Sequence, residues 1–588
     1  NYLRKMGAEF SRQYPKIAGR LELEVDGCPD PHIERMIESF AFLTGRVQYN
    51  IESELPQLSS SLLGVVYPQF INPTPSMSIA RFEPDLAQGG LTSGYLIPKN
   101  TPLFTHTEQG EICRFRTCYP TTLWPVRVVY AGFESPDQFD FPDHGKVLSV
   151  LRIRLESTKG RLSKLTGFNS LRFYINSDLM ISNLLYEMIF CNVFKTAVLK
   201  EKSRQPVFLP DNSLQPVGFG PKEDVLPYPP NAHSAYRLIH EYFTFSKKFL
   251  FFDVNLGTQI FKPDDTQFEI LMFMEEMPKK RLVIDQDTFC IGCTPIINLF
   301  PKTSEPVRSS IKLAEYPLVA DYQREKTSEI HSVLSVSASS DARDDSLTLE
   351  PYFSYNHLSE KRKQSAFYHI MRRNSNRHDL PGTQIYISFV DSNFKYIDPG
   401  ISTIFAHTLC TNRRLAEQIP SGAVLHAEIP APVSSIYSIG KPRPQIEPPL
   451  EGAAIWRLIS HLSLNYLSLT QGKESLKALQ EILMLYSFSE YTDMNQQITG
   501  IKEMSCKNVV RRMGDDAWRG FCRGIEITLT FDERLYVGNG AFLLASVLNH
   551  FFPLYASINT FTQLVIKSRQ REGVWNVWPP MVGEDEVF

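Results

Sequence analysis

Few residues in this sequence have the types and the spacing that chemistry requires. Cys290 and Cys293 form its single Cys-x-x-Cys pair, a spacing that can bind zinc or exchange disulfides. A zinc site needs a second pair of ligands, and no further Cys-x-x-Cys or His-x-x-x-His accompanies this one. A redox pair lies at the start of a helix, whereas Thr294-Pro295 follows here and favours extended backbone. We therefore predict that both cysteines are structural.

The motifs of nucleotide, metal and acyl-transfer enzymes are also missing. The sequence has no P-loop, no dinucleotide-binding glycine loop, no His-Glu-x-x-His and no Gly-x-Ser-x-Gly. Gly218-Phe-Gly220 and Gly538-Asn-Gly540 lack a third glycine and predict turns. A glycosidase pair of carboxylates can be distant in the chain, so an enzyme remains an alternative that no residue supports. The sequence therefore predicts no catalytic residue, no cofactor-binding residue and no metal ligand.

Composition narrows the class of protein further. The 588 residues include 61 Lys and Arg against 64 Asp and Glu, so the basic excess of a nucleic-acid-binding protein is missing. Nine cysteines at irregular spacings do not form a disulfide framework, which favours a reducing cytoplasm. The longest apolar stretch, 541–558, contains Asn549, His550 and Pro553, so we expect a core helix and not a membrane span. Lys247-Lys248 predicts a short exposed basic patch.

The elements that must position any site begin with an amphipathic helix near the start of the chain. Asp30 is a suitable N-cap, and Pro31 is a suitable first helical residue. Side chains that recur every three or four residues then predict one face, called here the N-terminal apolar face: Ile33, Ile37, Phe40, Thr44, Val47 and Ile51. This face packs either on its own domain or in a bundle with other chains, and the sequence leaves both alternatives open.

Beyond Pro75 the hydrophobic pattern changes to the period of two that is typical of strands. Strands are predicted at 126–130, 147–155, 171–175, 267–274, 281–285, 383–390 and 423–429. Helices are predicted over 179–199 and 236–243. Seven prolines between 206 and 230 predict a long exposed connection.

Two later stretches are typical of joints between domains. Residues 335–346 are rich in Ser and Asp with little to bury, and 429–450 contain six prolines, enough for a stiff extended linker. The C-terminal part then predicts helices over 456–467 and 476–485, a strand over 524–531, and a last helix over 543–555 that Pro553 should kink or shorten.

These elements predict an α+β, multidomain fold with N-terminal amphipathic helices, a β-rich middle region and an α/β C-terminal domain. The predicted boundaries give a helical region (1–70), a β-rich domain with the proline-rich connection (71–230), a second β-rich domain (231–445) and a C-terminal α+β domain (446–588).

Motifs in a fixed order along the whole chain resemble one known family. They include Tyr2-Leu-Arg-Lys-Met-Gly-Ala-Glu-Phe10, Cys28-Pro-Asp-Pro-His-Ile-Glu-Arg35, Phe115-Arg-Thr-Cys-Tyr119, Phe249-Leu-Phe-Phe-Asp253, Asn298-Leu-Phe300, Thr411-Asn-Arg413, Trp456-Arg-Leu-Ile-Ser-His-Leu-Ser-Leu-Asn465 and Phe521-Cys-Arg-Gly-Ile525. The set resembles TssF, also called VasA or ImpG, a baseplate protein of the bacterial type VI secretion system.

The resemblance implies a structural role without catalysis or a cofactor. Two copies of a TssF-like chain would join one TssG, together with TssK and TssE, in a wedge around the VgrG spike, and the TssB/TssC sheath and the Hcp tube would grow on this platform. The resemblance also implies a fold similar to the wedge proteins of contractile-phage baseplates, with the N-terminal apolar face in a bundle shared with TssG and a second copy. The expected location is the cytoplasm, in a baseplate docked at the inner-membrane complex, with no nucleic-acid partner and no direct membrane insertion.

Two alternatives to this resemblance remain. A wedge component of a phage or phage-tail-like particle would share the same architecture, and gene neighbourhood rather than residue chemistry would separate the two. An enzyme would need a nucleophile, metal set or cofactor loop that the sequence does not contain.

Overall fold

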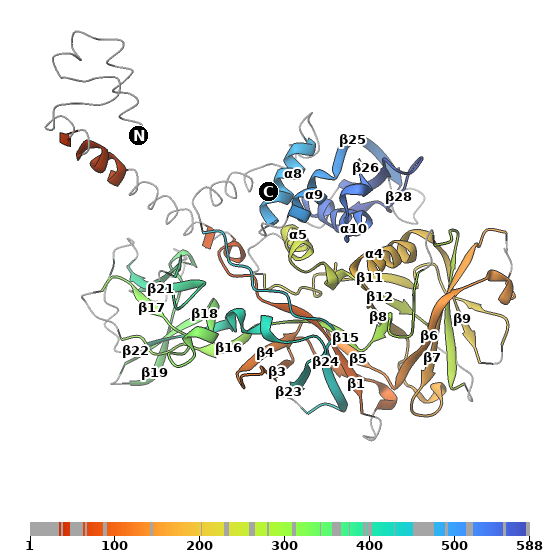
Figure 1. Ribbon diagram of the computed structural model, residues 1–588, viewed down its shortest axis with the longest axis horizontal. Coiled ribbons are helices and arrows are strands. Elements are labelled where there is room, and N and C mark those ends of the chain that lie inside the picture. Colours follow the sequence, from red (N-terminus) through yellow and green to blue (C-terminus); the bar gives the residue numbers. More distant parts are fainter. Residues whose placement is uncertain are drawn as a thin grey trace, which may run out of the picture.

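The computed structural model describes most of the chain and confirms the predicted α+β, multidomain class (Figure 1). The described residues are 35–36, 39–47, 63–64, 67–85, 91–141, 145–201, 203–228, 234–257, 265–278, 282–308, 313–340, 343–354, 366–375, 377–391, 396, 403–428, 430–450, 475–487, 492–512, 521–556 and 560–583. Within these ranges, no helix has both the length and the apolar character that crossing a membrane requires.

Six strands close a β-barrel in the middle of the molecule. Their order is β1 (Met77–Pro84), β15 (Cys293–Ile297), β4 (Ile112–Thr117), β3 (Pro102–His106), β23 (Val424–Ala427) and β24 (Val433–Ser438). Buried and partly exposed residues alternate along β4, as expected for a strand with one face on a core. The barrel closes where β24 returns to pair with β1, so it unites segments that are far apart in the chain.

Because β24 belongs to the barrel, the prediction of a free linker over 429–450 is wrong for much of its length. None of the six prolines lies within Val433–Ser438, so this part of the segment can donate every amide to a sheet. Further on, the backbone of Ile446 pairs with that of Thr74, and Gln445 is buried. The prolines therefore frame a strand and do not isolate a linker.

A five-stranded antiparallel sheet lies beside the barrel. Its order is β10 (Val207–Phe208), β9 (Val193–Lys200), β13 (Gln267–Met274), β7 (Ser149–Ser157) and β6 (Val126–Glu134). The helix predicted over 179–199 is wrong in its second half, because α4 (Leu179–Glu187) passes through one π-helical turn (Met188–Asn192) into β9. The β-branched residues of β9 suit a strand, and pairing with β13 on one side and β10 on the other outweighs the local helical pattern.

A four-stranded sheet brings together β11 (Leu214–Val217), β12 (Phe251–Asn255), β8 (Ser170–Ile175) and β14 (Phe289–Ile291). A separate pair joins β2 (Tyr95–Ile97) to β5 (Thr121–Leu123). The exposed connection predicted over 206–230 is also wrong, since it contains β10 and β11 and buries Val217, Val225 and Leu226. The strand predicted at 281–285 is not found, because 282–285 are described without regular structure.

The part in green at the left of Figure 1 packs two further sheets around a core of its own. One has the order β16 (Phe300–Thr303), β22 (Thr403–Thr411), β18 (Glu329–Ser340) and β19 (Arg343–Leu349); the other has β17 (Tyr316–Leu318), β21 (Thr383–Val390) and β20 (Phe367–Asn374). The joint predicted at 335–346 is wrong, because β18 and β19 form a hairpin there and bury Val336 and Ala338.

The C-terminal part combines helices with a mixed sheet. Its elements are α8 (Ser475–Tyr486), α9 (Thr492–Thr499), β25 (Ile501–Arg512), β26 (Phe521–Phe531), α10 (Ala541–Phe551), β27 (Thr560–Ser568), β28 (Asn576–Val577) and β29 (Met581–Val582). β27 pairs in parallel with β26, and α10 connects the two strands. The α-helix ends at Phe551 and a 3₁₀ turn over Phe552–Tyr555 contains Pro553, which confirms that this proline shortens the helix. The helix predicted over 456–467 lies outside the described residues.

One helix, α5 (Ser234–Phe245), lies between the C-terminal part and the sheets (Figure 1). Its Tyr236 ring stacks on Tyr486 of α8 at 5.6 Å between centroids and meets Phe551 of α10 edge-on at 6.0 Å. The aromatic residues Phe249 to Phe252 that follow it are fully buried in the largest core. α5 is therefore one of the elements that join the C-terminal part to the sheets; α4 is another, through Glu187, which pairs with Arg571.

Candidate functional site

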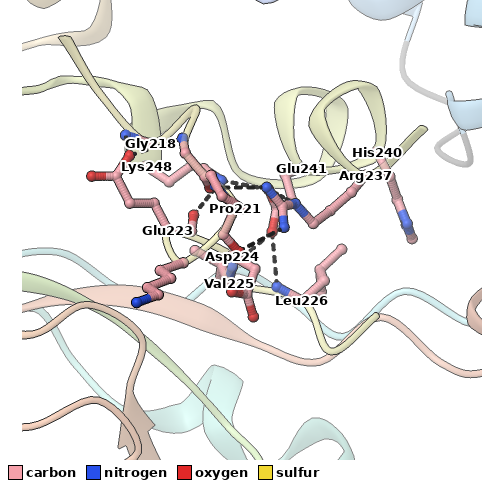
Figure 2. Close-up of polar contacts among 12 residues, drawn as sticks. Gly218, Pro221, Glu223, Asp224, Val225, Leu226, Arg237, His240, Glu241 and Lys248 are labelled. Atoms are coloured by element: carbon pink, nitrogen blue, oxygen red, sulfur yellow. Dashed lines mark hydrogen bonds and ion pairs between the residues drawn. The ribbon is translucent and has the colours of Figure 1, made fainter. Parts of the chain in front are cut away.

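Two oppositely charged side chains meet in the interior at the end of α5. Glu241 lies on α5 and Lys248 on the following 3₁₀ turn (Ser246–Phe249), and neither side chain is exposed to solvent. Lys248 Nζ donates to Glu241 Oε2, as the ammonium and carboxylate in Figure 2 show. Arg237, one helical turn before Glu241, places Nε 3.8 Å from the same oxygen. These three residues are called here the buried ion cluster.

The cluster also forms hydrogen bonds with the backbone of residues 220–226 (Figure 2). Glu241 Oε1 accepts from the amides of Val225 at 2.7 Å and Leu226 at 3.0 Å. Lys248 Nζ donates to the carbonyl of Glu223 at 2.9 Å, and Arg237 donates to that of Gly220 at 3.0 Å. Buried charges are tolerated when they are paired and hydrogen-bonded in this way, so the cluster holds an irregular loop against α5.

This arrangement does not suit acid–base chemistry. Burial lowers the pKa of the Lys248 ammonium, and the adjacent Glu241 carboxylate opposes that change. Both side chains are fully buried, and neither lines the two clefts described for the protein. The cluster is therefore a structural device that joins α5 to the loop.

The sequence prediction missed this cluster and was wrong about Lys248. Lys247 is exposed as predicted, but Lys248 is fully buried. A signal was present: Lys248 directly precedes four consecutive apolar residues, and Glu241 lies among the apolar residues of α5. Lys and Glu are almost never fully buried unless they are paired, so these apolar neighbours pointed to a pair without identifying its partners.

A second buried network joins the green sheets to the barrel. Glu329 Oε1 accepts from the amide of Thr383 at 2.9 Å, and its Oε2 accepts from Gln445 Nε2 at 2.7 Å. Arg413 Nε donates to the carbonyls of Glu325 and Ser328, each at 3.2 Å. Arg413 Nη1 also lies 3.6 Å from Glu329 Oε2, so the two charges oppose each other within the chain and stabilise the boundary between these parts.

The cysteines flank a tight turn, with Cys290 in β14 and Cys293 at the start of β15. Gly292 separates the two cysteines with a φ of 68°, a conformation that favours glycine. Cys290 Sγ donates to the carbonyl of Asp287 at 3.1 Å, and both thiols are free and buried. Hydrogen bonding to Cys293 lowers the pKa of Cys290, whereas burial raises the pKa of Cys293. Extended backbone after the pair is confirmed, since β15 begins at Cys293; the structural role of the thiols stays a prediction.

The N-terminal apolar face is described in part. Residues 39–47 are helical, and Phe40, Thr44 and Val47 lie on one side of this helix because they are spaced by four and three residues. Phe40 is 64% exposed and Val47 is 57% exposed, while Thr44 is also exposed. Ile33, Ile37 and Ile51 lie outside the described residues.

This helix exposes further apolar side chains beyond the predicted face. Phe42 and Leu43 are 70% and 58% exposed, and Figure 1 shows the red helix apart from the sheets. A helix that is apolar on most sides is normally buried, so a surface this large calls for a covering partner. It is the described feature with the clearest potential for binding, and the sequence had indicated it.

The sequence is similar to known proteins along nearly its whole length. A family model described as "Type VI secretion system, TssF" matches residues 1–585. The "Type VI secretion system component TssF1" of Pseudomonas aeruginosa is 32% identical over 606 residues, which cover 98% of this chain and 97% of that protein.

Two solved structures share the fold. A chain of a type VI secretion system TssK-TssF-TssG baseplate subcomplex aligns with a TM-score of 0.76 at 22% identity, covering 93% of this chain and 98% of that one. A chain of the baseplate complex from the type VI secretion system aligns with a TM-score of 0.58 at 21% identity, covering 100% and 98%.

Proposed function

The chain belongs to the TssF family of the type VI secretion system, and we propose that it is a structural subunit of the baseplate wedge, assembled with TssG and TssK. The observation that carries this proposal is the uncovered apolar helix at residues 39–47. The related structure comes from a complex named for TssK, TssF and TssG, and this chain covers nearly all of that relative. Family membership also favours a secretion system over a phage-tail particle.

The finer composition of the wedge is part of the same proposal. Two copies of the chain would join one TssG, with TssE as a further wedge protein, around the VgrG spike. The wedge would support the TssB/TssC sheath and the Hcp tube and would lie in the cytoplasm against the inner-membrane complex. Both buried charge networks support a structural role rather than catalysis, because backbone and side-chain partners within the chain occupy their charged groups.

In this proposal the N-terminal apolar face forms a helical bundle with TssG and a second copy. Phe40, Thr44 and Val47 would then be buried by partner chains and not by their own domain. Obligate interfaces of this kind bury about 2,000 Å² or more and resemble a domain core cut in half. The phenylalanines of this helix suit such an interface, where aromatic residues are enriched.

A single charge introduced into the N-terminal apolar face tests the proposal. Phe40→Asp should abolish co-purification with TssG, because an unpaired buried carboxylate costs about 3–5 kcal/mol. Ser39→Asp is the matched control, since it adds the same charge one residue away on a different side of the helix. Each variant is expressed with and without tagged TssG, and the captured chains are quantified by gel densitometry.

The same experiment separates the two alternatives for the helix. If the helix packed only on its own domain, Phe40→Asp would make the chain insoluble or protease-sensitive without TssG. A bundle instead predicts a soluble chain with an unchanged thermal midpoint that no longer captures TssG. Full capture of TssG by both Phe40→Asp and Val47→Asp would refute the bundle.

A further inference from the structure

One edge of the C-terminal sheet is long and has no neighbouring strand. In the described part of the chain β25 pairs with β26 alone, and its twelve residues make it the longest strand at any sheet edge there. It lies at the top of the C-terminal part in Figure 1, away from the barrel. An edge strand presents a row of backbone N–H and C=O groups with which another extended segment can pair.

The opposite edge of the same sheet is blocked. There β28 and β29 pair with β27 over two residues each, and Pro579 and Pro580 lie between them. Short edge strands offer few hydrogen bonds, and proline has no amide to donate, so both features prevent pairing with another chain. β25 is twelve residues long and contains no proline. Of the two edges, β25 is therefore the one that can accept a further strand.

The side chains of β25 divide this edge into two faces. Met504 and Cys506 are half-buried against the core, whereas Ser505 and Lys507, which alternate with them, are exposed. Towards the end of the strand the core no longer covers the first face, and Val510 is 58% exposed. Residues that lie opposite one another on paired strands share a face and contact each other. An incoming strand would therefore place apolar side chains on one face and polar side chains beside Lys507.

The charge of β25 selects the chemistry of that incoming strand. Four basic residues stand against one acidic residue, a net charge of +3: Lys502, Lys507, Arg511 and Arg512 against Glu503. Glu503 is already paired with Arg569 at 3.3 Å. Lys507 lies opposite Glu526 in the register, but that carboxylate pairs with Arg511 at 3.0 Å. Opposite charges on adjacent strands stabilise pairing and like charges destabilise it, so the edge favours an acidic strand.

We propose that β25 binds an extended segment of a partner protein in which acidic and apolar side chains alternate. The acidic side chains would lie beside Lys507 and the apolar ones beside Met504 and Cys506, while the backbone of the segment extends the sheet by one strand. A second copy of β25 suits the edge less well, because two strands that each carry a charge of +3 repel one another. The inference goes beyond the proposed function, since this edge is separate from the N-terminal apolar face.

Binding of designed peptides to the full-length protein tests the inference. The probe is a fluorescein-labelled peptide of about ten residues, the length of a long strand, in which Glu alternates with Val. The control is the same peptide with Lys in place of every Glu. Fluorescence anisotropy should show saturable binding of the acidic peptide and at least tenfold weaker binding of the basic one. Hydrogen exchange followed by mass spectrometry should show slower exchange of the amides of residues 503–510 when the acidic peptide is bound.

Charge variants show whether the peptide binds at this edge. Lys507→Glu should weaken binding of the acidic peptide at least tenfold, and Lys507→Gln should weaken it to a smaller extent. Lys567→Glu is the matched control, because it makes the same change at an exposed position of β27, which lies inside the sheet. This control should bind the peptide like the unchanged protein. Thermal midpoints show that the variants are intact, and Lys507→Gln replaces Lys507→Glu if the latter lowers the midpoint.

Several results would overturn the inference. It fails if the unchanged protein does not bind the acidic peptide saturably, or if Lys507→Glu binds the peptide as tightly as Lys567→Glu. It also fails if bound peptide slows hydrogen exchange outside β25 and not within it. A dimer of the protein alone that slows exchange in β25 would assign this edge to a second copy and would refute an acidic partner.

Discussion

Asn298 and Asn412 exchange two hydrogen bonds in the interior. Asn298 Nδ2 donates to Asn412 Oδ1 at 2.9 Å, and the amide of Asn412 donates to Asn298 Oδ1 at 2.7 Å. Asn298 Nδ2 also donates to the carbonyl of Arg114. The pair therefore connects β4 of the barrel to the end of β22. Its two members belong to separate sequence motifs, Asn298-Leu-Phe300 and Thr411-Asn-Arg413.

Removing the hydrogen bonds between Asn298 and Asn412 should lower the stability of the protein, and it should leave the solvent-exposed surfaces unchanged. Asn298→Ala leaves the amide of Asn412 and the carbonyl of Arg114 buried without this partner, at a cost of about 1–3 kcal/mol. The thermal midpoint should fall by several degrees, measured by differential scanning fluorimetry. Asn508→Ala, at an exposed position of β25, is the control and should leave the midpoint unchanged. A midpoint for Asn298→Ala equal to the control would mean that the pair is dispensable.

The stability of the protein should fall more when the buried ion cluster loses one charged partner than when it loses both. Lys248→Met leaves Glu241 charged and buried, which costs about 3–5 kcal/mol. Combining it with Glu241→Gln removes that charge and should recover part of the thermal midpoint, because the amide oxygen can still accept from Val225 and Leu226. Lys247→Met, the exposed neighbour, is the control. A double variant less stable than Lys248→Met would contradict a penalty based on unpaired charge.

Acid should weaken the fold through two buried histidines. Burial lowers the pKa of both His240 and His331 to about 3, whereas an unfolded histidine titrates near 6.5. Between these values the unfolded chain binds a proton that the folded chain excludes, so stability falls as pH drops from about 6.5 towards 3. Each histidine contributes up to about 1.4 kcal/mol per pH unit in that window.

Substitution should reduce this acid sensitivity. His331→Asn keeps a group near Nδ1 that can bond to Ser332 and removes the titration, so its thermal midpoint should fall less steeply between pH 6.5 and 4. The exposed His378→Gln should keep the slope of the unchanged protein. Identical slopes for both variants would rule out His331 as a source of the acid sensitivity.

The cysteine pair should be replaceable. Cys290→Ser with Cys293→Ser preserves a donor to the carbonyl of Asp287 and should leave baseplate assembly and secretion intact within a few-fold. Zinc content is measured by mass spectrometry on the purified protein. Stoichiometric zinc that disappears in the double variant, together with assembly, would reverse the structural interpretation.

The sequence predicted correctly those elements whose hydrophobic pattern is strongly periodic and whose state does not depend on distant segments. Apolar and charged residues alternate over 151–155, and the helix near 476–485 has an apolar stripe, so a strand and a helix are found within two residues of the expected bounds. Residues 193–199 are different, because their strand state depends on pairing with β13 some 70 residues later in the chain. The segment 335–346 looked polar, yet pairing of β18 with β19 and β22 brings Val336 and Ala338 into a core.

The residues of the candidate site likewise fall into those that local spacing predicts and those that only the tertiary fold brings together. Phe40 and Val47 were predicted from spacing alone, since a helix repeats every 3.6 residues whatever covers it. The sequence placed Glu241 and Lys248 beside apolar residues, but their pairing with each other and with the backbone amides of Val225 and Leu226 depends on the tertiary fold and could not be predicted.

Closure of the barrel by its first and last strands has a consequence for synthesis of the protein. The hydroxyls of Ser78 on β1 and Ser438 on β24 lie 2.8 Å apart but are 360 residues apart in the chain. At ribosomal rates of about 5–20 residues per second, roughly 20–70 s pass between the synthesis of β1 and that of β24. During this interval the nascent chain presents an open sheet edge, and the exposed N-terminal helix is already outside the ribosome. A chaperone that covered this edge would protect the nascent chain until the barrel closes.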